Sequence, residues 1–122
     1  MAAHRRIGLL QWAIILLTTA TALIHIGLAF QFGARVDLVF VLNGIGYLAL
    51  VGLLYLPISA LDGIRPGVRW ALIAYTAITV LAWMLIGVRS TVAYVDKAIE
   101  IALIVCLWFD WQQSRRKLPQ QS

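Results

Sequence analysis

The fold is decided by the stretch from Ile7 to Ala34, IGLLQWAIILLTTATALIHIGLAFQFGA, which runs for 28 residues without a charge. At a rise of about 1.5 Å per residue, roughly 20 apolar residues in a helix cross the ~30 Å hydrocarbon core of a bilayer. Two further charge-free stretches reach that length, Leu38 to Leu61 with 24 residues and Trp70 to Val88 with 19. Backbone groups must be satisfied within lipid, so we expect all three to be membrane-spanning helices.

A fourth segment, Ser90 to Trp111, is long enough to cross but has Asp96, Lys97 and Glu100 in its first half. We predict that it is also a span. The expected architecture is an all-α membrane protein, one domain over residues 1–122 that forms an antiparallel four-helix bundle. The predicted helices cover about 7–31, 37–58, 69–88 and 90–112, followed by a tail at 113–122. The connections are short, which favours antiparallel neighbours.

The composition excludes most other classes of protein. Hydrophobic residues make up 62% of the 122 residues and charged residues 12%, against roughly 45–50% and about 25% in an average soluble domain. A small soluble fold cannot bury that much apolar surface. The sequence has no nucleophile–base pattern and no phosphate loop, so we do not expect an enzyme. The single Cys106 lies inside an apolar stretch and forms no internal disulfide.

The net charge of +5 predicts orientation and not nucleic-acid binding, because the basic residues lie at breaks between apolar stretches. With the N-terminus inside, seven lie on the cytoplasmic side: Arg5, Arg6, Arg65, Arg69, Arg115, Arg116 and Lys117. Arg35 and Arg89 lie on the outer side. This positive-inside bias predicts a multi-pass protein of a prokaryotic cytoplasmic membrane with both termini in the cytoplasm. Helix caps are expected at Asp37 and at Ser90 or Thr91.

Polar side chains are expected to converge at one depth in the outer half of the bundle. The candidates for this intramembrane polar cluster are His25, Asn43, Asp96, Lys97 and Glu100. The last three lie about 9–15 Å down the fourth helix, where ionisable groups are costly and therefore functional candidates. Two structural alternatives stay open. Asp96 can cap a shorter fourth helix while Lys97 reaches the headgroups, or a buried cluster can serve only to hold the helices together.

Close helix packing is predicted at Gly44, Gly46 and Gly52 of the second helix, where small residues let another backbone approach. The neighbour is expected within the chain, with a partner subunit or a flat pigment, quinone or lipid as alternatives. No cofactor or metal is predicted. His4 and His25 lie at opposite ends, so haem ligated by two histidines would need a dimer. The ligand set His25, Asp96 and Glu100 has no metal-binding motif spacing.

Four stretches of the chain, TALIHIGLAF, FVLNGIGYLALVGLLYLP, RWALIAYTAITVLAW and YVDKAIEIALIV, resemble a family of small prokaryotic four-helix integral membrane proteins whose activity is uncharacterised. The likeness covers Thr21 to about Val105. It implies a four-span protein and transfers no functional residues.

The sequence favours a non-enzymatic role as an accessory or scaffold subunit of a larger prokaryotic membrane complex, respiratory or photosynthetic, or as a homo-oligomer. Four short helices leave little room for an enclosed pathway, and almost no soluble mass is present. The expected partners are the bilayer and other membrane subunits or further copies of the chain. One alternative is a small transporter or a proton- or ion-binding protein that uses the polar cluster, and another is a haem-, quinone- or pigment-binding subunit.

Overall fold

The computed structural model describes residues 8–30, 38–87 and 89–117. These residues form four long helices: α1 (Leu9–Ala29), α2 (Leu38–Tyr55), α3 (Arg65–Ile86) and α4 (Thr91–Lys117). A short 3₁₀ helix, η1 (Ser59–Ile64), precedes α3. No strand occurs in the part of the chain that is described, so the expectation of an all-α protein is confirmed.

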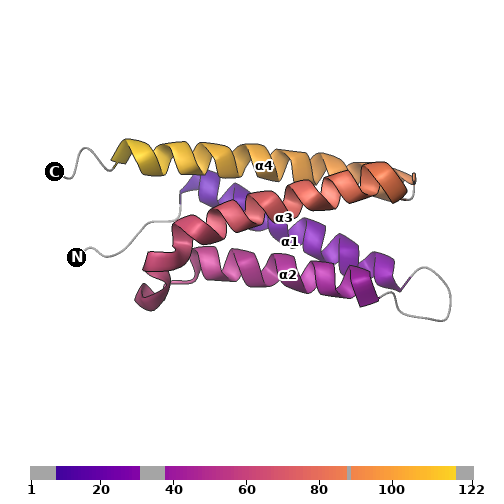
Figure 1. The fold of residues 1–122 in the computed structure, drawn as a ribbon, viewed down its shortest axis with the longest axis horizontal. Helices are drawn as coiled ribbons and strands as arrows, with labels where there is room; N and C mark the ends of the chain where they lie inside the picture. The colour runs from indigo at the N-terminus through magenta and orange to yellow at the C-terminus, as the bar shows by residue number, and fades with distance from the viewer. Residues whose placement is uncertain (1–7, 31–37, 88, 118–122) are drawn as a thin grey trace.

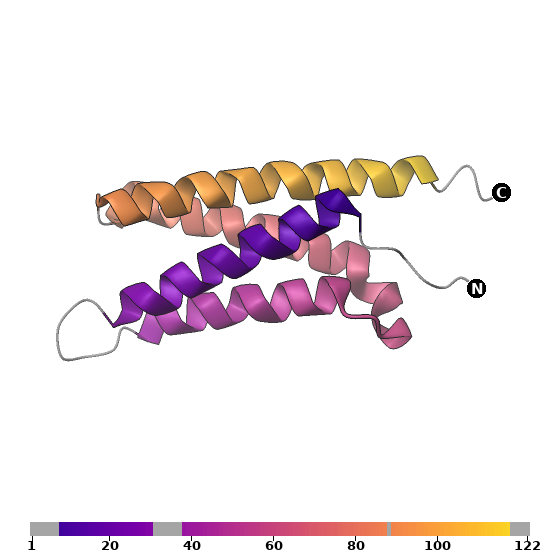
Figure 2. The same cartoon turned by 180° about the vertical axis from the view of Figure 1, so that it is seen from behind.

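The four long helices run alternately up and down, and each packs against its neighbours in the order α1–α2–α3–α4–α1 (Figure 1). The contact between α1 and α2 is the most extensive of the four, and that between α2 and α3 is the smallest. Seen from behind, α1 runs obliquely from the C-terminal end of α4 to the start of α2 (Figure 2). The start of α1, η1 and the end of α4 therefore lie at one end of the bundle.

The helix ends differ from the expected ones by four or more residues in two places and by one to three residues elsewhere. The third helix begins at Arg65 and not near residue 69, because Pro66 occupies its first turn, where a missing N–H does no harm. The fourth helix continues to Lys117 through residues expected to form a tail, since Gln, Arg and Lys are good helix formers. Ser90 caps α4 as expected, accepting a hydrogen bond from the Ala93 N–H at 3.1 Å. The predicted cap Asp37 lies outside the described residues.

An apolar layer fills the middle of the bundle. Its large buried aliphatic members come from all four long helices: Ile14, Leu54, Leu72, Leu103 and Leu107. On α4 the buried positions recur every three or four residues from Ala93 to Asp110, which is the period of one helix face. That face includes charged residues at both ends of the layer.

Three segments are long and apolar enough to cross a membrane by length and composition: Leu9–Ala29, Leu38–Tyr55 and Ser59–Ile86. Most of each lies on the surface of the bundle, with 17–33% of the residues of its most apolar window buried. Large apolar side chains cover that surface, among them Leu16, Leu42 and Leu85, with exposed fractions of 65, 65 and 83%. The three candidate spans thus have a largely apolar exterior.

Candidate functional site

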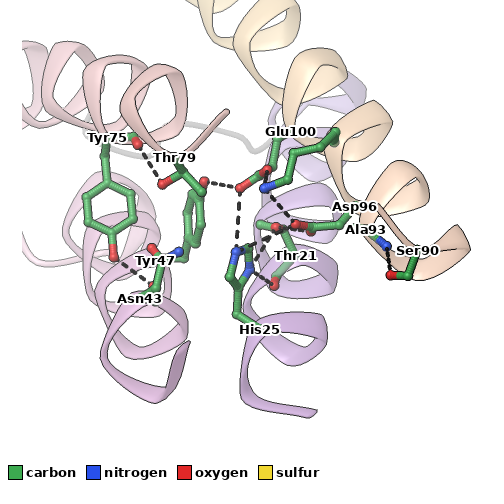
Figure 3. Close-up of polar contacts among 11 residues, drawn as sticks. Thr21, His25, Asn43, Tyr47, Tyr75, Thr79, Ser90, Ala93, Asp96 and Glu100 are labelled. Atoms are coloured by element: carbon green, nitrogen blue, oxygen red, sulfur yellow. Dashed lines mark hydrogen bonds and ion pairs between the residues drawn. The ribbon is translucent and has the colours of Figure 1, made fainter. Parts of the chain in front are cut away.

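Charged side chains of α4 lie inside the bundle, where they face side chains of α1 and α2 (Figure 3). Asp96, Lys97 and Glu100 are exposed by only 1, 7 and 0%. They occupy the buried face of α4 because spacings of three and four residues fall on one side of a helix. The structure therefore places these three residues inside the bundle and not at its surface, and Asp96 lies within α4 and not at its cap.

The ammonium group of Lys97 lies between the two carboxylates. Its Nζ is 2.6 Å from Oε1 of Glu100 and 3.2 Å from Oδ2 of Asp96. Lys97 thus neutralises one of the two negative charges within the site. Burial strengthens this attraction, because fewer water dipoles screen it.

His25 approaches the same carboxylates from α1. Its Nε2 lies 3.6 Å from Oδ2 of Asp96 and 4.0 Å from Oε2 of Glu100, and the residue is 2% exposed. Its Nδ1 lies 2.7 Å from the backbone carbonyl oxygen of Thr21, one turn earlier. A carbonyl oxygen can only accept, so Nδ1 carries the proton of this hydrogen bond. The Nε2 atom therefore faces the two carboxylates.

Two hydroxyl groups complete the site. The Thr21 hydroxyl donates to Oδ1 of Asp96 at 2.5 Å, and the Tyr47 hydroxyl of α2 donates to Oε2 of Glu100 at 2.5 Å. The ring of Tyr47 also packs against the His25 ring, with centroids 5.8 Å apart. The sequence prediction did not include Thr21 or Tyr47 among the cluster candidates, although Thr21 lies four residues before His25 and therefore on the same helix face. We call the six residues Thr21, His25, Tyr47, Asp96, Lys97 and Glu100 the charged site.

Asn43, the remaining member of the expected cluster, lies beside this site on α2 and is half-buried. Its backbone carbonyl oxygen accepts a hydrogen bond from the Tyr75 hydroxyl of α3 at 2.7 Å. The Tyr75 ring packs edge-on against Tyr47, with centroids 4.8 Å apart. Asn43 is thus linked to the charged site through the side chains of Tyr75 and Tyr47.

The three glycines predicted at packing contacts have different surroundings. A Cβ atom on Gly44 would lie 2.7 Å from the Ala22 carbonyl oxygen of α1, so the two backbones approach too closely for any larger residue. On Gly46 it would collide with the Tyr75 side chain. On Gly52 the nearest atom would be 3.6 Å away, and this glycine lines an apolar groove of about 310 Å³ between α1 and α2.

A second buried ion pair lies beyond the apolar layer, toward the end that holds η1. Nε of Arg69 on α3 is 2.9 Å from Oδ2 of Asp110 on α4. The Gln11 side chain of α1 donates to the other oxygen of Asp110 at 2.6 Å. Sequence reasoning missed this pair. Asp110 lies two heptads after Asp96 and therefore on the same helix face, which was the available signal.

One group of residues has the spacing of a metal site. His25, Asp96 and Glu100 each offer a ligand atom, and these atoms lie within 4.8 Å of one another. However, the Lys97 ammonium already contacts one oxygen of each carboxylate. A metal ion held by these three residues would compete with that cation for Oδ2 of Asp96, the oxygen that lies 3.6 Å from Nε2 of His25. The arrangement of these four side chains thus fits an internal cation better than a bound metal.

Comparisons with known proteins give no match: no protein-family model, curated protein or solved structure is similar to this chain. The function is therefore inferred from the geometry of the charged site alone.

Proposed function

We propose that this chain is a small membrane protein that crosses a prokaryotic cytoplasmic membrane four times and binds a cation inside the bilayer. Three helices have the length and composition of spans. The fourth, α4, would cross beside them because its charged residues face the interior of the bundle. We do not propose an enzymatic activity for it.

The orientation is proposed from the described basic residues. Arg65 and Arg69 lie in the first turns of α3, and Arg115 lies in the last turns of α4, at the same end of the bundle (Figure 1). Arg89 lies at the opposite end. Since basic residues are enriched on the cytoplasmic side, both termini would be cytoplasmic and the charged site would lie in the outer half of the membrane.

The observation that supports cation binding is the pair of buried carboxylates that already surrounds a cation, the Lys97 ammonium. Each ionisable residue costs at least about 2.5–3.5 kcal/mol near the bilayer centre on insertion scales. A core with a purely structural role can avoid this cost. Replacing a buried ion pair with apolar residues of similar volume often leaves the stability of the fold unchanged or raises it by about 1–4 kcal/mol. Four ionisable groups in one site are better explained by the ion that they bind.

The proposal is tested by chemical modification of the carboxylates in the full chain reconstituted into lipid vesicles. The probe is dicyclohexylcarbodiimide, an apolar reagent that adds to a protonated carboxyl group and remains attached as an N-acylurea. We expect labelling of Asp96 or Glu100, located by mass spectrometry, at a rate that depends on the cation in the medium. H⁺, Na⁺, K⁺ and Zn²⁺ are varied one at a time.

Asp62 provides the matched control, because its side chain is 70% exposed and lies at the end of the bundle. Glu100→Gln should retain the helical content and the monodisperse elution of the wild type and lose the cation dependence of labelling. The proposal is wrong if Asp96 and Glu100 respond to every condition as Asp62 does. They would then hold the helices together and do nothing more.

A scaffold role in a larger assembly, or in an oligomer of this chain, is a second candidate, and the exposed end of α3 favours it. Leu81, Leu85 and Ile86 are exposed by 56, 83 and 87%. Extraction from native membranes in mild detergent should then recover the chain with a defined partner or as an oligomer. Elution as a lone monomer would contradict the scaffold role and leave the cation site unaffected.

A further inference from the structure

With both carboxyl groups ionised and His25 neutral, the charged site would hold one more negative charge than positive charge. Two carboxylates of α4 face one ammonium, and the groups that face them from α1 and α2 are the His25 imidazole and the hydroxyls of Thr21 and Tyr47. Among the described residues of α3, the charged side chains Arg65 and Arg69 lie at the other end of the helix, and Arg69 pairs with Asp110. An unpaired charge is costly in a buried site. One additional positive charge would make the site neutral.

His25 is placed to supply that charge. Its Nδ1–H is fixed by the hydrogen bond to the Thr21 carbonyl, so the nitrogen that gains a proton is Nε2. Nε2 lies 3.6 Å from Asp96 and 4.0 Å from Glu100. At these separations the carboxylates stabilise an imidazolium by Coulomb attraction without a hydrogen bond.

We propose that the cation exchanged at the charged site is a proton, which binds to Nε2 of His25 between the carboxylates of Asp96 and Glu100. This inference rests on the proposed cation-binding function and names its ion. The proton comes from water, forms the Nε2–H bond and leaves by the reverse step, so nothing is oxidised or reduced. A proton needs no space of its own, whereas a metal ion would compete with Lys97 for Oδ2 of Asp96.

The fold also predicts the end of the bundle from which the proton comes. Asp96 lies five residues after the first residue of α4, about 7.5 Å along the helix axis. In the other direction the layer of Ile14, Leu72, Leu103 and Leu107 is fully buried and apolar. The site therefore exchanges with the end of the bundle where α4 begins, and a pathway through the whole bundle is interrupted by this layer.

The test is ¹⁵N NMR of the full chain in lipid nanodiscs as a function of pH. The chain has two histidines, so a His4→Gln background leaves His25 as the single imidazole. We expect Nδ1 to stay protonated throughout, while Nε2 changes from protonated to unprotonated as the pH rises. Zn²⁺ and Na⁺ are added at fixed pH to detect competition by other cations.

Three variants are compared, two expected to lower the proton affinity of His25 and one expected to raise it. The result can therefore be interpreted even if one of them folds poorly. Glu100→Gln and Asp96→Asn each remove a negative charge and should lower the proton affinity of His25 at least about tenfold. Lys97→Met removes a positive charge and should raise it by a similar factor. Asp62→Asn, the distant control, should leave it unchanged.

The proton inference is overturned if Nε2 titrates identically in the wild type and in these variants. If His25 does not respond to pH but Na⁺ or Zn²⁺ changes the carbodiimide labelling, cation binding stands and the proton is the wrong ion. If neither His25 nor the labelling responds to any cation, both proposals are wrong.

Discussion

Replacing Asp110 with asparagine tests how strongly the second ion pair holds the bundle together. Asp110 and Arg69 are exposed by 6 and 4%, and their charged groups are 2.9 Å apart. Asparagine has nearly the same volume, so no cavity forms. It can still accept the hydrogen bond from Gln11, which reaches Asp110 at 2.6 Å. The substitution therefore removes one charge and leaves the Arg69 guanidinium buried without its counter-ion.

Breaking a buried pair in this way costs about 3–5 kcal/mol, because the remaining charge stays desolvated. The equilibrium constant of unfolding should rise by roughly 10²- to 10⁴-fold, since each 1.4 kcal/mol is a factor of ten. The double variant Arg69→Met/Asp110→Leu should recover most of the loss, because apolar residues replace a buried pair without penalty.

The assay is unfolding in mixed micelles of mild detergent and SDS, followed by circular dichroism. The control is Asp62→Asn, which removes the same charge from an arginine pair of the same length, 2.9 Å, in which the carboxylate is 70% exposed and the arginine is buried. Arg65 keeps its hydrogen bonds to backbone carbonyls at the end of α2, including those of Leu54 and Ile58, so the cost should stay below about 1 kcal/mol. Equal shifts for Asp110→Asn and Asp62→Asn would refute the reasoning.

Four further substitutions have expected outcomes in the same unfolding assay. Gly46→Ala should destabilise by about 1–3 kcal/mol because the new methyl group meets the Tyr75 side chain, whereas Gly52→Ala has room and should change little. Ser90→Ala removes the cap of α4 and should cost about 1 kcal/mol, with fraying detected by hydrogen exchange in the first turn. Tyr47→Phe leaves a Glu100 oxygen without its donor and should cost about 1–3 kcal/mol; a neutral effect would mean that water replaces the hydroxyl.

The helices were predictable from the sequence because charge-free stretches of sufficient length leave few alternatives in a chain of this composition. The breaks between them were less predictable. Pro66 and Gly67 indicate a turn when taken alone, yet Pro66 also fits the first turn of a helix, and α3 uses it there. Asp96, Lys97 and Glu100 were predicted to be unusual for a span, but sequence could not separate burial from an interfacial position. Whether these side chains are buried depends on how α4 is rotated about its axis relative to α1, and this rotation is set by the packing of the helices.

The ionisable residues of the charged site that stand out in apolar sequence were predicted, whereas its two hydroxyl-bearing residues were not. His25 and the three charged residues of α4 stand out in apolar stretches, and the structure brings these four together. Asn43 was predicted as a member of the cluster and Tyr47 was not, although both lie on one face of α2, four residues apart. Tyr47 is the residue that reaches the site, since its longer side chain spans the distance from α2 to Glu100.

The pairing of the charges on α4 has a consequence for how the protein is made. Asp96, Glu100 and Asp110 all have partners on helices that precede α4 in the chain: His25, Tyr47, Arg69 and Gln11. A nascent α4 would therefore enter lipid unfavourably by itself. Because α4 is synthesised last, the proposed topology has its partner helices in the membrane before it leaves the ribosome. The residues that pair with the charges of α4 are thus synthesised before α4 itself. A rearranged chain with α4 first should insert poorly into the membrane.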